Sequence, residues 1–309
     1  MNLKNIKIGV IMGGLSSERD ISLKSGMAMY NELKKHNHRV VAIDIKERNI
    51  NKILKEKIDV ALLALHGTYG EDGVMQGILE FHGIPYTGSG VLGSVLGMNK
   101  IIAKQLFSHN GIPTPKWCVI ENINEVEKIK MKFPLVFKPN AEGSAIGVSI
   151  VNNKNEAKKA YKKASRYGDK VLVEKYIKGI EISVPVLLNK ALPIIEIIPK
   201  KQFYDYTAKY TKGMSEHRIP ARINGTAYKK AQYYALKAHK VLECRDYSRI
   251  DMIVRGNNVF VLEVNTLPGM TSLSLFPESA RYYGISFYEL LLIFIKSALR
   301  RKKNAKLQI

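Results

Sequence analysis

Residues 249–265 have the pattern of a β-hairpin, the most clearly defined element in the sequence. Residues 249–255 and 259–265 alternate in polarity and are rich in Val and Ile, which favours strands. The segment Arg255-Gly256-Asn257-Asn258 between them is typical of a tight turn. A three-residue loop at residues 256–258 predicts three cross-strand pairs: Arg255 with Val259, Asp251 with Glu263, and Arg249 with Asn265.

This register gathers charged groups on one face, because side chains two residues apart share a face of a strand. Asp251 and Glu263 lie side by side, and neighbouring carboxylates repel each other unless a cation lies between them. Hard oxygen ligands without His or Cys suit Mg²⁺, which often also binds phosphates. A solvated hairpin face has the same spacing, so the spacing alone leaves both interpretations open. The polar, Gly-containing loop at residues 266–272 favours the metal site.

The composition is that of a globular protein. With 309 residues, 46% of them hydrophobic, the chain can bury a sizeable core in two or three domains. The longest apolar run, residues 290–295, is too short to span a bilayer, and no signal-peptide cleavage site follows residues 8–12. Cys118 and Cys244 lie far apart without metal-ligand spacing, which predicts free thiols in a reducing cytosol. We therefore expect a cytoplasmic protein without a membrane segment.

The net charge of +22 is the main argument for a different function, nucleic-acid binding. However, the lysines are spread along the chain, mostly on polar helix faces, and the only dense basic cluster lies at residues 300–303. No known RNA- or DNA-binding motif accompanies that cluster. We therefore expect no specific nucleic-acid partner, although the positive field can attract anionic ATP.

Residues 1–92 alternate between strand and helix patterns. Strands are predicted at residues 6–12, 39–44 and 60–65, and a helix at residues 22–35. This order predicts parallel βαβ units that bind ligands at the C-terminal ends of the strands. Two loops fall at those ends, one containing Glu18 and one beginning at His66. A first-turn charge favoured by the helix dipole and a structural histidine are the simpler interpretations of these two residues.

Two smaller α+β regions are predicted at residues 93–179 and 180–309. In the first, a strand ending at Lys138 leads into a loop of small residues, 139–148, whose backbone can contact phosphates. A plain hairpin is the alternative. A second strand carries Glu174 and Lys175 at its end, where a solvated edge is the alternative.

The last region ends with two features of different kinds. Residues 203–220 form a long, aromatic, charged segment that is typical of a functional lid. A closing helix is predicted at residues 287–299. The basic tail after it carries none of the motifs, so we expect residues 300–309 to be dispensable for catalysis.

Two motifs resemble the signatures of a known family, the D-alanine–D-alanine ligases of the ATP-grasp superfamily. Glu263-Val264-Asn265-Thr266-Leu267-Pro268-Gly269-Met270-Thr271 resembles their C-terminal signature. His66-Gly67-Thr68-Tyr69-Gly70-Glu71-Asp72-Gly73 resembles their N-terminal signature. The resemblance runs from about residue 13 to residue 289, with the motifs in the family's order. It implies an α/β protein of ATP-grasp architecture, in which a parallel βαβ domain precedes two α+β domains that hold ATP between them.

The resemblance also implies roles for individual residues. It places in catalysis Glu18, Ser144, Tyr210, Arg249, Gly269 and Ser274. It places in substrate binding His66, Lys209 and Leu275, and at ATP Lys100, Lys138, Glu174, Lys175 and Glu181. It implies two Mg²⁺ or Mn²⁺ ions on Asp251, Glu263 and Asn265. Relatives often carry a second Ser where this chain has Ala145, which leaves Ser144 as the only hydroxyl there.

The activity implied is the ATP-dependent ligation of two D-alanines through an acyl phosphate, for peptidoglycan precursor synthesis. The partners are then the small molecules D-alanine and ATP, and since relatives are often dimers, a second copy of the chain. A depsipeptide ligase that accepts D-lactate as its second substrate shares nearly every motif. Such enzymes commonly have Phe where this chain has Tyr210, so the sequence favours the dipeptide product.

Overall fold

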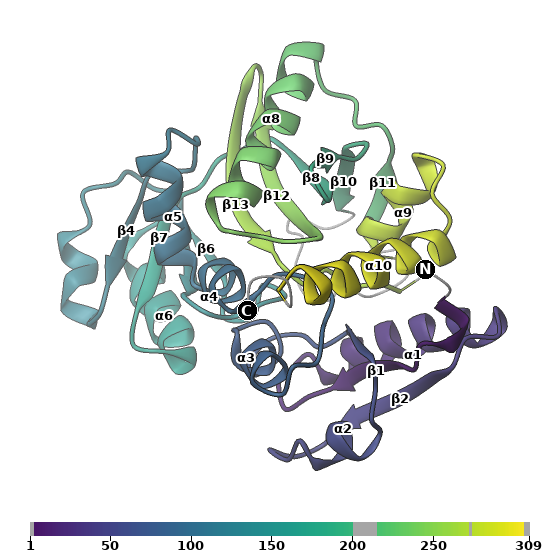
Figure 1. Ribbon diagram of the computed structural model, residues 1–309. Helices are drawn as coiled ribbons and strands as arrows, with labels where there is room; N and C mark the ends of the chain where they lie inside the picture. The colour runs from purple at the N-terminus through teal and green to yellow at the C-terminus, as the bar shows by residue number, and fades with distance from the viewer. Residues whose placement is uncertain (1–2, 200–214, 272–273, 306–309) are drawn as a thin grey trace.

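The computed structural model describes residues 3–199, 215–271 and 274–305, and these residues form three β-sheets with helices packed on them. Figure 1 shows the sheets as three groups, the N-terminal one at the bottom, the second at the left and the third at the top. The mixture of helices and sheets agrees with the predicted α/β class.

The N-terminal sheet is parallel, as the alternating pattern predicted. Its strand order is β2-β1-β3, with bounds Val40–Ile45, Ile8–Gly13 and Val60–Leu63. Every residue of β1 and β3 is buried, as expected for a parallel sheet covered by helices. The elements beside these strands are a 3₁₀ helix (Leu3–Asn5), α1 (Arg19–Lys35), α2 (Asn51–Lys55) and α3 (Val74–Phe81).

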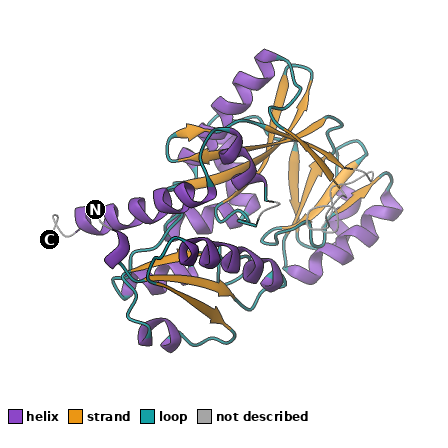
Figure 2. Ribbon diagram, turned by 90° about the vertical axis from the view of Figure 1, so that its right-hand side faces the viewer, coloured by secondary structure: helices purple, strands orange, loops and turns teal. Residues whose placement is uncertain are grey.

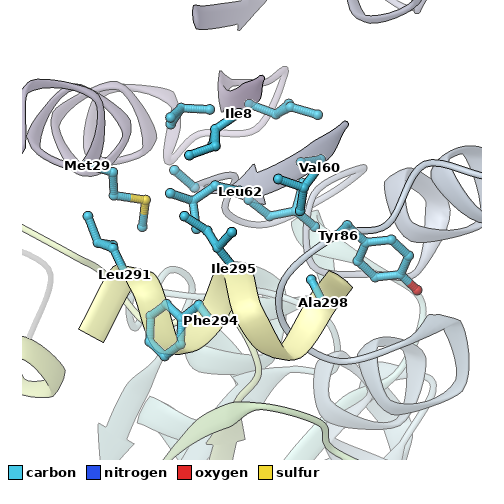
Figure 3. Packing of buried hydrophobic residues seen from close by; sticks show 14 of the residues in the cluster. Ile8, Met29, Val60, Leu62, Tyr86, Leu291, Phe294, Ile295 and Ala298 are labelled. Atoms are coloured by element: carbon cyan, nitrogen blue, oxygen red, sulfur yellow. The ribbon is translucent and has the colours of Figure 1, made fainter. Parts of the chain in front are cut away.

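Helix α10 (Phe287–Ala305) lies between the N-terminal sheet and the third sheet (Figures 1 and 2). Its side chains Leu291, Phe294 and Ile295 are buried in one core cluster with Leu62 of β3 and Met29 of α1 (Figure 3). Each fully buried side chain of this size stabilises the fold by roughly 2 kcal/mol. The helix closest to the C-terminus therefore completes the core of the first domain of the chain.

The basic tail is part of α10, which continues to Ala305 instead of ending at the predicted residue 299. Arg301 forms an ion pair with Asp246 and donates from Nη2 to the carbonyl oxygen of Tyr86 at 2.7 Å. The Asp246 side chain, only 1% exposed, also accepts from the Gly88 N–H at 2.9 Å and from Ser297 Oγ at 2.6 Å. Arg301 therefore has a structural role, with a partner 55 residues earlier in the chain, and the expectation that the tail is dispensable for catalysis stays a prediction.

No single helix in the described part of the chain is long and apolar enough to cross a membrane. Helix α9 (Leu275–Tyr282) and the first part of α10 pass that test only as a pair, by length and composition, with a bend of 105° between them. In this structure Phe276 of α9 and Leu290 of α10 are buried in the same core cluster.

The second sheet is antiparallel and has the order β4-β7-β5-β6. These strands span Trp117–Ile120, Val171–Lys175, Leu135–Pro139 and Ser149–Val151. Helix α6 (Lys154–Ala164) covers it and buries small residues at helical spacing, among them Ala157, Ala160 and Ala164. The Asn153 side chain caps this helix by accepting from the Glu156 N–H at 3.0 Å. Two 3₁₀ helices, Ile123–Lys128 and Ser165–Tyr167, flank this region.

Helices α4 (Val91–Met98) and α5 (Lys100–His109) lie between the second and third sheets. Ala103 and Phe107 of α5 are buried in the core cluster of the third sheet. By packing, α5 thus belongs with the third sheet, although the predicted division at residue 93 groups it with the second. The domain boundaries at residues 93 and 180 remain predictions.

The third sheet has the order β11-β10-β8-β12-β13, and β9 pairs with β8. Its strands are β8 (Ile180–Leu187), β9 (Lys190–Ala191), β10 (Ile195–Pro199), β11 (Ser215–Arg218), β12 (Tyr247–Arg255) and β13 (Asn258–Asn265). Helix α8 (Gly225–Val241) packs on it through Ala227, Ala231, Ala235 and Ala238, whose small side chains let the helix approach closely.

The hairpin of β12 and β13 has a different turn from the one predicted. Arg255 pairs with Asn258 and not with Val259, so the loop contains two residues, Gly256 and Asn257, with Gly256 at φ +60°. A β-bulge at Leu262 then shifts the register by one residue. Beyond the bulge Asp251 faces Glu263 and Arg249 faces Asn265, as predicted. The incorrect turn and the unexpected bulge cancel before the charged face is reached.

Candidate active site

The charged face of the hairpin is a network centred on Asp251. Arg249, two residues away on the same face of β12, donates from Nε to Asp251 Oδ1 at 3.0 Å and from Nη2 to Oδ2 at 2.8 Å. Asn265 Nδ2 donates to Asp251 Oδ2 at 3.1 Å, and Ser183 Oγ donates to Oδ1 at 2.8 Å. Across the strand pair, Glu263 Oε2 lies 3.5 Å from Lys100 Nζ. Cationic side chains of the protein thus offset the repulsion between the two carboxylates.

The donor set of this face fits a hard divalent cation. Asp251, Glu263 and Asn265 offer only oxygen donors to a metal, the type that Mg²⁺ and Mn²⁺ prefer. Within residues 3–199, 215–271 and 274–305, no group of three or more His, Cys, Asp and Glu side chains has the arrangement of a metal site. A cation on this face would therefore bind to two carboxylates and an amide, and would complete its shell with oxygens from outside the protein.

A cavity of about 110 Å³ lies between the second sheet and the hairpin. All five residues predicted to bind ATP line it, together with two predicted metal ligands: Lys100, Lys138, Glu174, Lys175, Glu181, Asp251 and Glu263. The apolar side chains Val136, Ile177 and Leu262 form another part of its wall. The cavity therefore combines an apolar surface, cationic groups that suit phosphates, and carboxylates that suit a cation.

Glu174 is the most deeply buried charge in this wall. Its side chain is 2% exposed and forms ion pairs with both Lys104 and Lys138. Burial favours the neutral carboxyl, but the two lysines outweigh this effect and lower the pKa of Glu174. Burial likewise opposes the charge of Lys138, and the Glu174 carboxylate outweighs it and raises the pKa of Lys138. Lys138 is therefore a fixed cation at the cavity.

The other two cavity lysines are also held in place. Lys100 Nζ donates to the Glu142 carbonyl oxygen at 2.6 Å, which links the start of α5 to the loop after β5. Lys175 Nζ donates to the carbonyl oxygens of Lys132 at 2.9 Å and Phe133 at 3.0 Å. Lysine side chains fixed in this way lose little further freedom when they bind an anion.

Glu18 and Ser144 form a contact between the N-terminal domain and the loop after β5. The Ser144 hydroxyl donates to Glu18 Oε1, and both side chains are buried. Gly143 makes this approach possible, because a Cβ atom at that position would lie 2.5 Å from Glu18 Oε2. Burial, followed by the negative charge of Glu18, raises the pKa of Glu142 in the same loop, and Lys100 opposes this effect. Two of the residues that the family resemblance places in catalysis are thus in direct contact.

His66 has a buried ring with an unused polar atom. Its Nδ1 is 3.9 Å from Glu71 Oε1, whereas Nε2 has no hydrogen-bond partner in the described part of the chain. Burial lowers the pKa of His66, but Glu71 and then Glu18 outweigh it, so that the pKa is raised above its ordinary value of 6.5. A buried donor without a partner is costly, which makes Nε2 a candidate for binding a ligand.

The loop after β13 brings Gly269 close to Ser274. A Cβ atom at Gly269 would lie 3.0 Å from Ser274 Oγ, and Oγ accepts from the Thr271 N–H at 2.9 Å. The side chain of Leu275 is buried in a cluster with Ile195 and Ile197. Only the backbone of Leu275, at the start of α9, is then available to a substrate.

Two predicted residues, Lys209 and Tyr210, lie outside the described residues. Conversely, the sequence analysis did not identify Lys104, which pairs with Glu174 inside the wall of the cavity. The available signal was its spacing of four residues from Lys100, which puts both lysines on one face of a helix.

A second cavity, of about 180 Å³, lies at the C-terminal ends of the strands of the first sheet. Leu65, His66 and Tyr69 line it together with apolar residues of α3 such as Met75. The Arg48 guanidinium lies over the Tyr69 ring at 4.9 Å from its centre. This cavity adjoins the His66 loop.

Comparison with known proteins shows the family to which the chain belongs. The family model described as D-ala D-ala ligase N-terminus matches residues 47–89, and the model described as D-ala D-ala ligase C-terminus matches residues 106–296. The D-alanine–D-alanine ligase of Geotalea uraniireducens is 50% identical over 292 residues, which cover 93% of this chain and 94% of that protein. This chain belongs to the D-alanine–D-alanine ligase family. Another relative, the D-alanine–D-alanine ligase of Carboxydothermus hydrogenoformans, is 49% identical over 92% of this chain and 96% of its own length.

Solved structures of D-alanine–D-alanine ligases share the fold. The crystal structure of the ligase from Bacillus anthracis complexed with ATP has a TM-score of 0.85 and 41% identity, covering 97% of this chain and 99% of that one. The structure of the Coxiella burnetii ligase has a TM-score of 0.84 at 27% identity, over 99% of this chain and 97% of that one. The predicted ATP-grasp architecture is therefore confirmed.

Proposed function

We propose that this chain joins two D-alanine molecules into D-alanyl-D-alanine at the expense of ATP, in the synthesis of peptidoglycan precursors. The observation that carries the proposal is the cavity between the second sheet and the hairpin, where residues from separate motifs converge. The relatives that are about half identical over nearly the whole chain are named D-alanine–D-alanine ligases. ATP as a substrate is supported by the Bacillus anthracis relative, whose structure contains ATP.

The chemistry proceeds in two transfers. The carboxylate of the first D-alanine attacks the γ-phosphorus of ATP, which forms an acyl phosphate and releases ADP. The neutral amine of the second D-alanine then attacks the acyl carbon, and the tetrahedral intermediate expels inorganic phosphate. Positive charge is needed at the phosphates in the first step and hydrogen-bond donors at the oxyanion in the second.

At the nucleotide, Lys100 and Lys138 bind the phosphates and Glu181 binds the ribose hydroxyls. Lys175 and the strand end at Glu174 contact the adenine edge, while the Glu174 carboxylate keeps Lys138 in place. Asp251, Glu263 and Asn265 would hold divalent cations, which supply neutralisation of the triphosphate charge when bound.

At the amino acids, Glu18 binds the ammonium group of the first D-alanine, and His66 Nε2 binds its carboxylate. Arg249 and the Gly269 N–H donate to the oxyanion. Ser274 and the backbone of Leu275 hold the carboxylate of the second D-alanine. Ser144 and Tyr210 close the loops over the substrates, and Lys209 binds phosphate.

The function is tested by ADP release with ATP, Mg²⁺ and D-alanine. We expect release with D-alanine and none above background with L-alanine. D-lactate added as a second acceptor tests the depsipeptide alternative. If ADP appears only when D-lactate is present, or equally with L-alanine, the proposed substrate pair is wrong.

The charge of His66 predicts a pH dependence for the first substrate. Because its pKa is raised above 6.5, the ring is cationic below that raised pKa and loses its proton as the pH increases through it. The KM for the first D-alanine should therefore rise several-fold at alkaline pH, as the cation facing the carboxylate is lost. Initial rates between pH 6 and pH 9 measure this, and the rise should vanish in His66→Gln. An identical pH profile in the variant would remove His66 from the site.

We also propose a cellular location, a division into domains and an oligomeric state. A cytoplasmic location suits an enzyme that consumes ATP and has two free cysteines, Cys118 and Cys244. The three predicted segments, 1–92, 93–179 and 180–309, are kept as domains because each contains one of the sheets.

A homodimer is supported by exposed apolar side chains on the neighbouring helices α3 and α4, among them Phe81 (88% exposed) and Leu92 (59%). Light scattering of the purified protein measures the mass, and a monomer would contradict the dimer.

A further inference from the structure

Lys104 is a fully buried lysine that none of the proposed roles uses. Its side chain is 1% exposed, and its ammonium group forms an ion pair with Glu174 Oε1. It also donates to Thr114 Oγ1 at 2.5 Å. A charged lysine is rarely buried to this extent. Burial lowers the pKa of Lys104, and the Glu174 carboxylate is the main influence that opposes this effect.

The charges around Glu174 are unequal in number. One carboxylate lies between two ammonium groups, because Lys104 contacts Oε1 and Lys138 contacts Oε2. With all three groups ionised, the triad carries one net positive charge. Only Lys138 among its members is partly open, at 13% exposed, and it lines the cavity. The surplus charge therefore faces the cavity.

Lys104 also connects the two walls of the cavity. Thr114, which accepts from Lys104, donates from its hydroxyl to the Val261 carbonyl oxygen at 2.8 Å. The Val261 N–H in turn donates to the Pro113 carbonyl oxygen at 2.8 Å. Val261 precedes the bulged Leu262 and the candidate metal ligand Glu263 in β13. One buried side chain thus contacts a carboxylate of the second sheet and, through Thr114, the strand that carries the metal site.

We infer that Lys104 is a positioning residue for ATP. It neutralises Glu174, so that the charge of Lys138 remains available to the nucleotide phosphates instead of being cancelled inside the wall. Without Lys104, Glu174 and Lys138 form a neutral pair, and the triad loses its net positive charge. This inference rests on the proposed function, since it assigns the cavity to ATP.

The test is the ATP affinity of Lys104→Met, measured by calorimetry without D-alanine. Methionine keeps the length and apolar stem of lysine and removes the charge. The Kd for ATP should rise on the order of tenfold, the effect of one charge acting through the protein over about 10 Å. Lys116→Met is the matched control, because Lys116 is exposed nearby and loses the same charge; its Kd should stay close to that of the wild type.

The variant Lys104→Met combined with Glu174→Gln separates charge from packing. It leaves Lys138 as the only charge of the triad and restores the net charge of one. If charge balance is the cause, the double variant should bind ATP more tightly than Lys104→Met, with a Kd lower by about threefold or more. A merely structural role predicts that the double variant binds ATP no better than the single one, and that result would overturn the inference.

The remaining outcomes are also decisive. Wild-type affinity in Lys104→Met would show that Lys104 has no influence on ATP. Should Lys104→Met not fold, as judged by thermal melting, Lys104→Gln takes its place in both comparisons, because its amide has no charge but can still donate to Glu174 or Thr114. If the wild-type protein does not bind ATP, the proposed function itself is wrong. If the wild type binds ATP and only the variants deviate from the expected Kd values, the proposed function stands and the inference about Lys104 is wrong.

Discussion

Replacing Glu263 with glutamine should reduce Mg²⁺-dependent ADP release by roughly a hundredfold or more, about 2.7 kcal/mol of barrier, while the fold stays intact. Glu263 faces Asp251 across the hairpin, so the substitution removes one of the two carboxylates offered to the cations. The same change relieves the repulsion between the two acids and leaves Lys100 with an amide as its neighbour. The variant should therefore lose activity without losing stability. Initial rates at several Mg²⁺ concentrations, together with thermal melting, measure both.

Glu216→Gln is the matched control for this prediction. Glu216 lies on β11 of the same sheet, its side chain is 62% exposed, and it is not part of the cavity. Its variant should retain the wild-type rate and Mg²⁺ dependence. Wild-type activity in Glu263→Gln would instead disprove the assignment of Glu263 as a metal ligand.

Replacing Arg301 with methionine should lower the free energy of unfolding by about 2–3 kcal/mol and leave the activity of the folded protein close to normal. The reason is that Asp246, 1% exposed, loses its only cationic partner in the described part of the chain. The loss of unfolding free energy should be at or below the lower end of the range for a broken buried ion pair. The reason is that the Gly88 N–H and Ser297 Oγ still donate to the Asp246 carboxylate. Urea denaturation measures the change.

The neighbouring Arg300 provides the control, since it is exposed and precedes Arg301 in the same helix. Arg300→Met should change the stability by a few tenths of a kcal/mol at most. Truncation after Leu299 should destabilise the protein at least as much as Arg301→Met. A truncated protein as stable as the full chain would show that the ion pair of Arg301 with Asp246 does not stabilise the fold.

The hairpin illustrates what the sequence can and cannot predict. Alternating polarity and a Gly-Asn turn identify two paired strands, and the resemblance of residues 263–271 to a family signature indicates their use. The loop length is harder to predict, because two-residue and three-residue turns have similar composition. The bulge at Leu262 leaves no local signal, since it depends on how β12 and β13 fit their neighbours in the sheet. The charged pairs were predicted correctly only because these two errors cancel.

Ion pairs between residues far apart in the chain could not be predicted from the sequence patterns. Lys104 is one of many helix lysines in a chain of net charge +22, and its spacing of four residues from Lys100 does not by itself show that it is buried. Its burial becomes visible only when β7 brings Glu174 against α5. The same holds for Asp246 and Arg301, which lie in a loop and in a basic tail. Leu275 reads as part of a substrate motif, and only the packing on Ile195 and Ile197 reveals its place in the core.

The most direct test of the account follows oxygen from the carboxylate of the first D-alanine. The wild-type protein is incubated with ATP, Mg²⁺ and D-alanine labelled with ¹⁸O in its carboxylate, and the products are analysed by mass spectrometry. Attack of this carboxylate on the γ-phosphorus predicts one dipeptide for each ADP, with one ¹⁸O atom in the inorganic phosphate. Unlabelled phosphate, or ADP without D-alanyl-D-alanine, would contradict the proposed ligation through an acyl phosphate.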